Sequence, residues 1–162
     1  MRGGDVQAKE GVVERLNTIL TNELTAINQY FIHTEMCKNW GYERLYHDLY
    51  EFSISEMKDA QQLIEHILYL EGVPNLQRLG TIEVGENVPE HLRLNVALEQ
   101  AAVATYTEAI AHCAQVGDYT TRGILEDMVR EEEEHLDWLE TQLETIQQVG
   151  TEIYLAQQIK KD

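Results

Sequence analysis

EEEEHLDWLE, residues 131–140, contains a glutamate and a histidine three positions apart, Glu132 and His135, in a run without a helix breaker. Residues three positions apart lie on one face of an α-helix, so both side chains would point in the same direction. In a chain with 29 acidic residues, a single such pair is most often part of a solvated helix face. Its meaning therefore depends on whether the arrangement recurs.

The arrangement does recur, because the chain is internally doubled. In each half two glutamates lie 33 positions apart, a tyrosine follows the first by seven positions, and the second opens an E-x-x-D or E-x-x-H step. The repeated residues are Glu23, Tyr30, Glu56 and Asp59 in the first half and Glu99, Tyr106, Glu132 and His135 in the second. Carboxylates and an imidazole at matched offsets indicate a set of metal ligands.

Composition limits what kind of protein can hold such a set. With 162 residues and 43% apolar content, the chain is long enough for one well-buried domain, which we expect to span 1–162. It starts with a polar segment and has no apolar run near the ~20 residues of a membrane span, so we expect a cytoplasmic protein without a membrane partner. A net charge of −17 disfavours nucleic acid and favours cations. Cys37 and Cys113 are interpreted as reduced, buried thiols.

Apolar periodicity predicts an all-α fold. Apolar residues recur at intervals of three and four along four long stretches, which is typical of amphipathic helices. The stretches run from Val13 to Thr34, from Leu45 to Leu70, from Leu92 to Cys113 and from Leu125 to Ile146. The first helix is predicted over about residues 8–38.

Helix breakers predict how these helices connect. The short stretch 39–41 permits only a tight hairpin, and Gly117 with Asp118 turns the chain into the fourth helix, whereas 72–87 is long enough to run the length of a helix before Pro89 starts the third. The prediction is an antiparallel four-helix bundle with one long crossover between its second and third helices. Residues Thr151 to Lys161 are predicted to form a short fifth helix.

The repeated acids fall on the apolar faces of the four predicted helices and should point into the bundle. Several buried carboxylates would repel one another or stay protonated unless a positive ion lay between them. Carboxylate oxygens with an imidazole suit iron or manganese better than zinc. The sequence therefore predicts a pair of divalent ions at the middle of the bundle, as in di-iron carboxylate bundles.

Five segments resemble the bacterioferritins, and the similarity in order and spacing runs nearly end to end. They are NELTAINQYF (22–31), KNWG (38–41), SEMKDA (55–60), LYLEGVPNLQ (68–77) and EEEEHLDWLE (131–140). The resemblance implies a ferritin-like bundle assembled from dimers into a hollow shell of twenty-four subunits that stores ferric mineral. It implies a ferroxidase, which oxidises Fe(II) with O2 or H2O2 at a di-iron centre, and a ferredoxin-type reductant as a partner.

The same resemblance implies roles for individual residues. Met57 would be the axial ligand of a haem b held between two subunits. The ligands of the ferroxidase centre would be Glu23, Glu56, Glu99, Glu132 and His135, with Glu56 and Glu132 bridging. Asp59, three residues after Glu56, is predicted as a further metal ligand by its own position. No catalytic residue beyond these ligands is expected.

Met57 is also informative by its position. It follows Glu56 by one residue, about 100° around the helix, and so cannot share the inward face. Its own face carries an apolar stripe that a monomer would expose to water, formed by Tyr50, Ile54, Met57, Ile64 and Leu68. The stripe predicts packing against another subunit. A thioether presented twice at a twofold axis would suit a six-coordinate haem for electron transfer.

Asp59 departs from the family pattern, because bacterioferritins usually place a histidine there. Glu51 and Ser55 likewise stand where well-known members carry a histidine and an aspartate for an iron site on the inner surface of the shell.

Two hypotheses follow: an active ferroxidase, or a haem-carrying storage and electron-conduit subunit that works in a mixed shell with a second chain type. A di-iron oxygenase resembling ribonucleotide reductase is the third and weakest.

The remaining histidines are interpreted without a metal role. His66 is predicted to be a hydrogen-bonded core histidine, since it lies on the inward face beyond Asp59. Structural or surface positions are predicted for His33, His47, His91 and His112.

Overall fold

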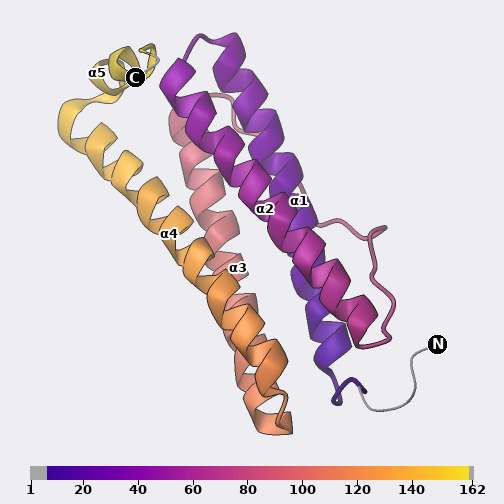
Figure 1. Ribbon diagram of the computed structural model, residues 1–162. Coiled ribbons are helices and arrows are strands. Elements are labelled where there is room, and N and C mark those ends of the chain that lie inside the picture. The colour runs from indigo at the N-terminus through magenta and orange to yellow at the C-terminus, as the bar shows by residue number, and fades with distance from the viewer. Residues whose placement is uncertain (1–6, 161–162) are drawn as a thin grey trace.

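The computed structural model describes residues 7–160, and these form five α-helices without a strand. The helices are α1 (Val12–Asn39), α2 (Glu43–Tyr69), α3 (Val88–Val116), α4 (Tyr119–Val149) and α5 (Thr151–Gln158). The four long helices lie side by side as a bundle, and α5 lies at the end reached by α4 (Figure 1). The predicted all-α bundle with a short fifth helix is confirmed; Lys161, the predicted end of that helix, lies outside the described residues.

The connections have the predicted lengths. Helices α1 and α2 form one antiparallel hairpin and α3 and α4 another, while residues 70–87 return along the bundle so that α2 and α3 run in the same direction (Figure 1). No helix within 7–160 is long and apolar enough to cross a membrane.

Helix ends follow local chemistry, with one correction to the prediction. Helix α1 begins at Val12 and not near residue 8, because Gly11 adopts a left-handed conformation with φ of 77° that interrupts a helix there. Asn87 caps α3 by accepting a hydrogen bond from the Glu90 N–H at 2.9 Å. Asp118 caps α4 in the same way.

The crossover is held against α1 by a row of polar side chains spaced four residues apart. These are Asn17, Thr21, Thr25, Gln29 and His33. Along the row, Asn17 donates to the Val73 carbonyl at 3.0 Å, and Thr25 accepts from the Gly80 N–H at 2.8 Å. Because residues four apart share a helix face, one side of α1 guides the whole crossover to the start of α3.

Two apolar clusters divide the bundle interior. The first contains Leu16, Ile19, Leu20, Leu63, Ile67 and Leu125, and the second contains Leu45, Leu49, Leu92 and Leu139. In every long helix the repeated glutamate lies, in sequence, between the residues of one cluster and those of the other. The fold thus places a polar layer between two apolar ones.

Candidate metal centre

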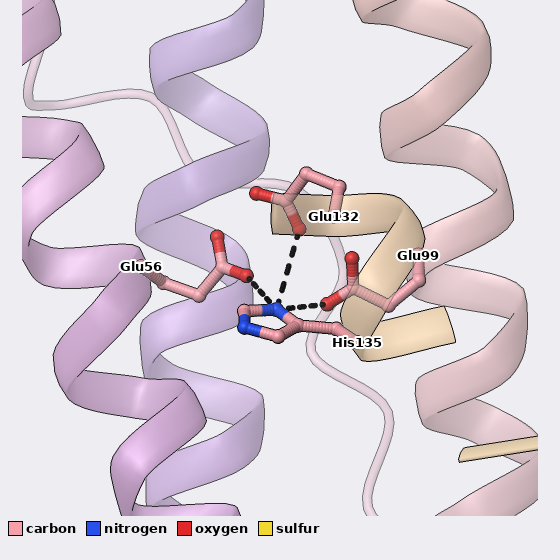
Figure 2. A group of neighbouring side chains, drawn as sticks. All are labelled: Glu56, Glu99, Glu132 and His135. Atoms are coloured by element: carbon pink, nitrogen blue, oxygen red, sulfur yellow. Dashed lines mark hydrogen bonds and ion pairs between the residues drawn. The ribbon is translucent and has the colours of Figure 1, made fainter. Parts of the chain in front are cut away.

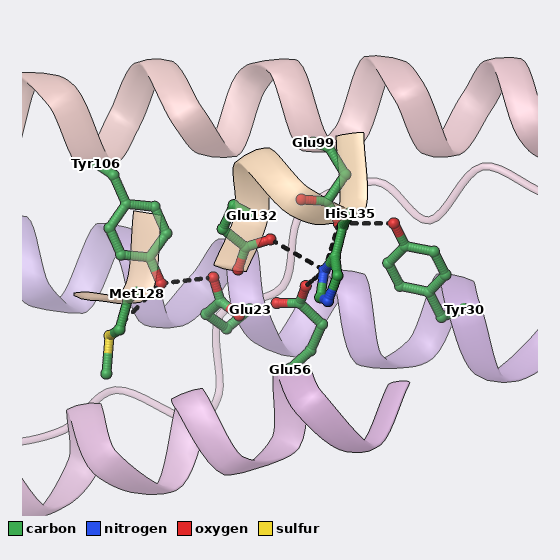
Figure 3. Close-up of polar contacts among 8 residues, drawn as sticks. All are labelled: Glu23, Tyr30, Glu56, Glu99, Tyr106, Met128, Glu132 and His135. Atoms are coloured by element: carbon green, nitrogen blue, oxygen red, sulfur yellow. Dashed lines mark hydrogen bonds and ion pairs between the residues drawn. The ribbon is translucent and has the colours of Figure 1, made fainter. Parts of the chain in front are cut away.

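One glutamate from each long helix reaches the polar layer at the middle of the bundle. Glu23 comes from α1, Glu56 from α2, Glu99 from α3 and Glu132 from α4, and each side chain is almost fully buried (Figure 3). His135 lies one turn after Glu132 on α4 and is also buried. The helical periodicity that buries the neighbouring leucines brings these polar groups together.

The donors form two overlapping groups of four. One group is Glu56, Glu99, Glu132 and His135, and the other is Glu23, Glu56, Asp59 and Glu132. Within each group one donor atom per residue lies within 4.8 Å of the others. Two ligands about 2.1 Å from one ion lie at most about 4.2 Å apart, so a small contraction would let each group hold an ion. Glu56 and Glu132 belong to both groups and are available to bridge.

The imidazole of His135 points into the first group. Its Nδ1 lies 3.1 Å from Glu56 Oε1 and 3.7 Å from both Glu99 Oε1 and Glu132 Oε2 (Figure 2). Three carboxylates from three helices thus face one ring nitrogen. A metal cation bound at this point would replace the proton that His135 Nδ1 shares with these carboxylates.

The buried carboxyl groups have strongly shifted pKa values. Burial, with the neighbouring carboxylate of Glu56, raises the pKa of Glu23, and burial also raises that of Glu56. Burial likewise raises the pKa of Asp59 and that of Glu99 to about 8. Burial disfavours the charged form of His135, but the carboxylates of Glu132 and Glu99 outweigh it and raise its pKa to about 10.

Unpaired oxygen atoms mark the same place. Seven buried side-chain nitrogen or oxygen atoms in residues 7–160 lack a hydrogen-bond partner, and six of them are carboxylate oxygens of this layer. They belong to Glu23, Glu56, Asp59, Glu99 and Glu132. Leaving such atoms unpaired costs about 1–3 kcal/mol each, and more when they are charged. A pair of divalent cations would satisfy them.

Two tyrosines complete the layer, and the sequence pattern singled out both without assigning them a role. Tyr30 donates a hydrogen bond to Glu99 Oε1 at 2.6 Å, and Tyr106 donates to Glu23 Oε1 at 2.8 Å (Figure 3). Both phenols are fully buried. The signal in the sequence was their common spacing of seven residues after a glutamate.

Phe52 is a neighbour of the centre that sequence reasoning did not identify. Its ring stacks on His135 with 4.3 Å between ring centroids, and it packs edge-to-face with Trp138 and Tyr30. Phe52 occupies an ordinary apolar position of α2, so nothing in the periodicity distinguished it from a core residue.

Met57 lies outside this centre, on the outward face of α2. Its side chain is 49% exposed, and Tyr50 and Leu68 on the same stripe are 43% and 56% exposed. Ile54 and Ile64 are half-buried. The predicted apolar stripe is therefore present on the surface of the chain.

The other histidines lie away from the metal groups. His66 is buried and its Nε2 lies 2.8 Å from Thr121 Oγ1, which confirms a hydrogen-bonded core histidine. His33 and His91 are buried and stacked on each other beside the crossover. His47 is exposed and His112 is half-buried.

Comparison with known proteins agrees with this geometry. Residues 13–149 match the ferritin-like domain of the ferritin family. The chain is 40% identical over 156 residues to a bacterioferritin of Mycobacterium leprae, covering 96% of this chain and 98% of that protein. It is 41% identical over 143 residues to a bacterioferritin of Brucella melitensis, covering 88% and 89%. A bacterioferritin of Rhodobacter capsulatus is 42% identical over 139 residues, 86% of each chain. The chain therefore belongs to the bacterioferritins, within the ferritin-like family.

Proposed function

We propose that the chain is an iron-storage subunit that oxidises Fe(II) at the centre described above. The observation that carries the proposal is the pair of donor groups sharing Glu56 and Glu132, with buried carboxylate oxygens left unpaired. Fe(II) would be the substrate, and ferric mineral in a shell the product. The bacterioferritins that match this chain over 96% and 88% of its length support this assignment.

The chemistry needs two electrons from two Fe(II) ions. O2 with two protons would be reduced to H2O2, or H2O2 with two protons to two waters. The protein supplies fixed ligands: Glu56 and Glu132 would hold both ions, while His135 and Glu99 would bind one and Asp59 with Glu23 the other. The carboxyl protons that burial retains in the absence of metal would leave as the cations bind.

The proposal includes a haem b between two copies of the chain, with Met57 as its ligand from each. A half-exposed thioether amid an outward apolar stripe fits a ligand shared across a twofold axis. When bound, such a haem would carry electrons. Tyr50 and Leu68 would help to exclude water from its apolar faces.

A closed shell of twenty-four subunits built from such dimers, supplied with electrons by a ferredoxin-type protein, completes the proposal. A single domain over 1–162 and a cytoplasmic location are proposed with it. Among the described residues both cysteines, Cys37 and Cys113, are free and buried, as suits a reducing compartment.

An alternative is favoured by Asp59, which leaves one of the two groups with oxygen donors alone. In that alternative the chain carries haem and conducts electrons in a mixed shell, and a second chain type performs rapid oxidation. An oxygen pulse to a shell of this chain alone, preloaded with Fe(II), separates the two. Fast oxidation of two Fe(II) per chain supports the ferroxidase; slow or incomplete oxidation that a second chain type restores supports the conduit. Absence of Fe(II) binding would contradict both.

A further inference from the structure

Helices α1 and α3 exchange two reciprocal hydrogen bonds across the centre. Tyr30 of α1 donates to Glu99 of α3, and Tyr106 of α3 donates to Glu23 of α1 (Figure 3). The reciprocity arises because the helices are antiparallel and each tyrosine follows its own glutamate by seven residues. Each phenol is buried; Tyr106 has one further, weak contact with Met128 Sδ at 3.7 Å.

The two bonds fall on different metal groups. Glu99 belongs only to the group that contains His135, and Glu23 belongs only to the group that contains Asp59. The two shared carboxylates, Glu56 and Glu132, receive no hydrogen bond from either phenol. Each tyrosine therefore contacts a glutamate that belongs to only one of the two groups.

The bonds also fix the orientation of each carboxylate. Each phenol donates to Oε1, which in Glu99 is also the oxygen 3.7 Å from His135 Nδ1, whereas Oε2 of Glu23 and Oε2 of Glu99 are buried without a hydrogen-bond partner. A carboxylate held at one oxygen cannot rotate freely, so its position as a ligand is set by the phenol. Hydrogen bonds of this kind to ligating carboxylates commonly contribute 10–100-fold in metal affinity.

The geometry points to Tyr106 and Tyr30 as positioning residues that act on separate subsites, with Tyr106 setting the affinity of the Glu23 and Asp59 subsite and Tyr30 that of the Glu99 and His135 subsite. This inference rests on the proposed two-metal function. The Asp59 subsite depends more strongly on its tyrosine, because it has no imidazole to orient the ion.

Anaerobic titration of the full-length protein with Co(II) tests the inference. Calorimetry resolves two binding steps, and visible absorption separates cobalt bound to imidazole from cobalt bound to oxygen alone. Tyr106→Phe should weaken the oxygen-only step about tenfold or more and leave the imidazole-bound spectrum intact. Tyr30→Phe should do the reverse.

Tyr154→Phe is the matched control, since Tyr154 is a buried tyrosine that donates to Gln142 far along the bundle. It should alter neither step. If Tyr106→Phe does not fold, Tyr106→Met fills the space without the hydroxyl. Equal weakening of both steps by Tyr106→Phe, or no change in either, overturns the inference. Wild-type protein that binds fewer than two Co(II) per chain contradicts the two-metal centre itself.

Discussion

At the scale of single residues, Asp59 controls how alike the two metal groups are. It is buried beside Glu131 and Glu132 on α4, and it supplies an oxygen where family members usually supply an imidazole. Asp59→His restores a neutral nitrogen ligand three residues after Glu56, so the two subsites should become more alike. We expect Fe(II) oxidation by the isolated shell to accelerate about tenfold, as followed by ferric absorbance.

The wild-type rate decides the meaning of that result. If wild-type protein already oxidises two Fe(II) per chain rapidly, and Asp59→His leaves the rate unchanged or lower, then Asp59 is a competent ligand. The mixed-shell alternative would then be wrong.

Met57 provides the second residue-scale prediction. Met57→Leu conserves volume and apolar character, so the chain should fold and assemble as before but bind no haem, because only the soft ligand is removed. Haem absorbance of the purified shell measures this directly. Met36→Leu, a half-buried methionine of α1, is the control and should retain haem. If Met57→Leu still binds haem, a residue other than Met57 is the ligand of the haem iron.

Residue patterns predicted which buried acids and histidine meet at the middle of the bundle, but not their surroundings. Glu132 and His135 were recognised because helical spacing alone decides that they share a face. The bond from Tyr30 to Glu99 was not predicted, because it depends on the register between two helices far apart in sequence. Stacking of Phe52 on His135 is likewise a consequence of packing between α2 and α4 that no local pattern specifies.

At the scale of elements, the crossover is the part that periodicity described least. Its length predicted at which end of the bundle α3 begins. Asn17 and Thr25, however, look like ordinary polar residues of a helix until the path of the crossover is known. The most constrained point is Gly85, where an added Cβ would lie 2.6 Å from His91 Cδ2 and 2.8 Å from the His91 backbone nitrogen. Only glycine fits this approach without displacement.

Two stacked histidines hold Gly85. The Gly85 N–H donates to His33 Nε2 at 3.1 Å, and the Gly85 carbonyl accepts from His91 Nε2 at 2.8 Å. The His33 ring therefore carries its proton on Nδ1, which donates to Asn95 Oδ1 at 3.0 Å. The ring centroids are 3.8 Å apart. His33 can accept this bond only when its ring is neutral, whereas His91 can donate to the Gly85 carbonyl in either charge state.

This clamp should make stability depend on pH. Burial, with the His91 ring, lowers the pKa of His33 to about 4, and burial lowers that of His91 despite the Gly85 bond and Glu90 nearby. The adjacent Cys37 thiol stays neutral, since burial raises its pKa to about 12. Because the folded pKa of His33 lies below its ordinary value of 6.5, the contribution is complete above that value and is lost as pH falls toward 4.

The unfolding free energy in urea, measured from pH 7.5 to 4, should fall by on the order of 2 kcal/mol through this clamp. His33→Gln should flatten that part of the profile, because an amide keeps a donor and an acceptor but does not titrate. His47→Gln, at an exposed histidine, should leave the profile unchanged. Identical pH profiles for wild type and His33→Gln would show that the clamp is not acid-sensitive.

At the scale of the whole molecule, the outward stripe of α2 predicts assembly. Exposed apolar side chains around Met57 would be covered by a second copy, and a charge introduced on the stripe would be buried at that interface without a partner. Light scattering should report a particle far heavier than a dimer for wild type. Leu68→Lys should reduce the mass towards 18.7 kDa while the helical circular dichroism is kept, because Leu68 is 56% exposed in the single chain. Gln62→Lys, an exposed position on another side of α2, is the control. A wild-type protein that is a stable monomer at micromolar concentration would contradict the proposed shell.

The central claim is that the polar layer between the two apolar clusters holds a pair of iron ions bridged by Glu56 and Glu132. Crystals soaked anaerobically with Fe(II) and measured at the iron absorption edge test it most directly. The account predicts two anomalous peaks about 3.5–4 Å apart, one beside His135 and Glu99 and the other beside Asp59 and Glu23, with the second at lower occupancy. No peak in this layer, or a single peak that contacts neither Glu56 nor Glu132, would contradict it.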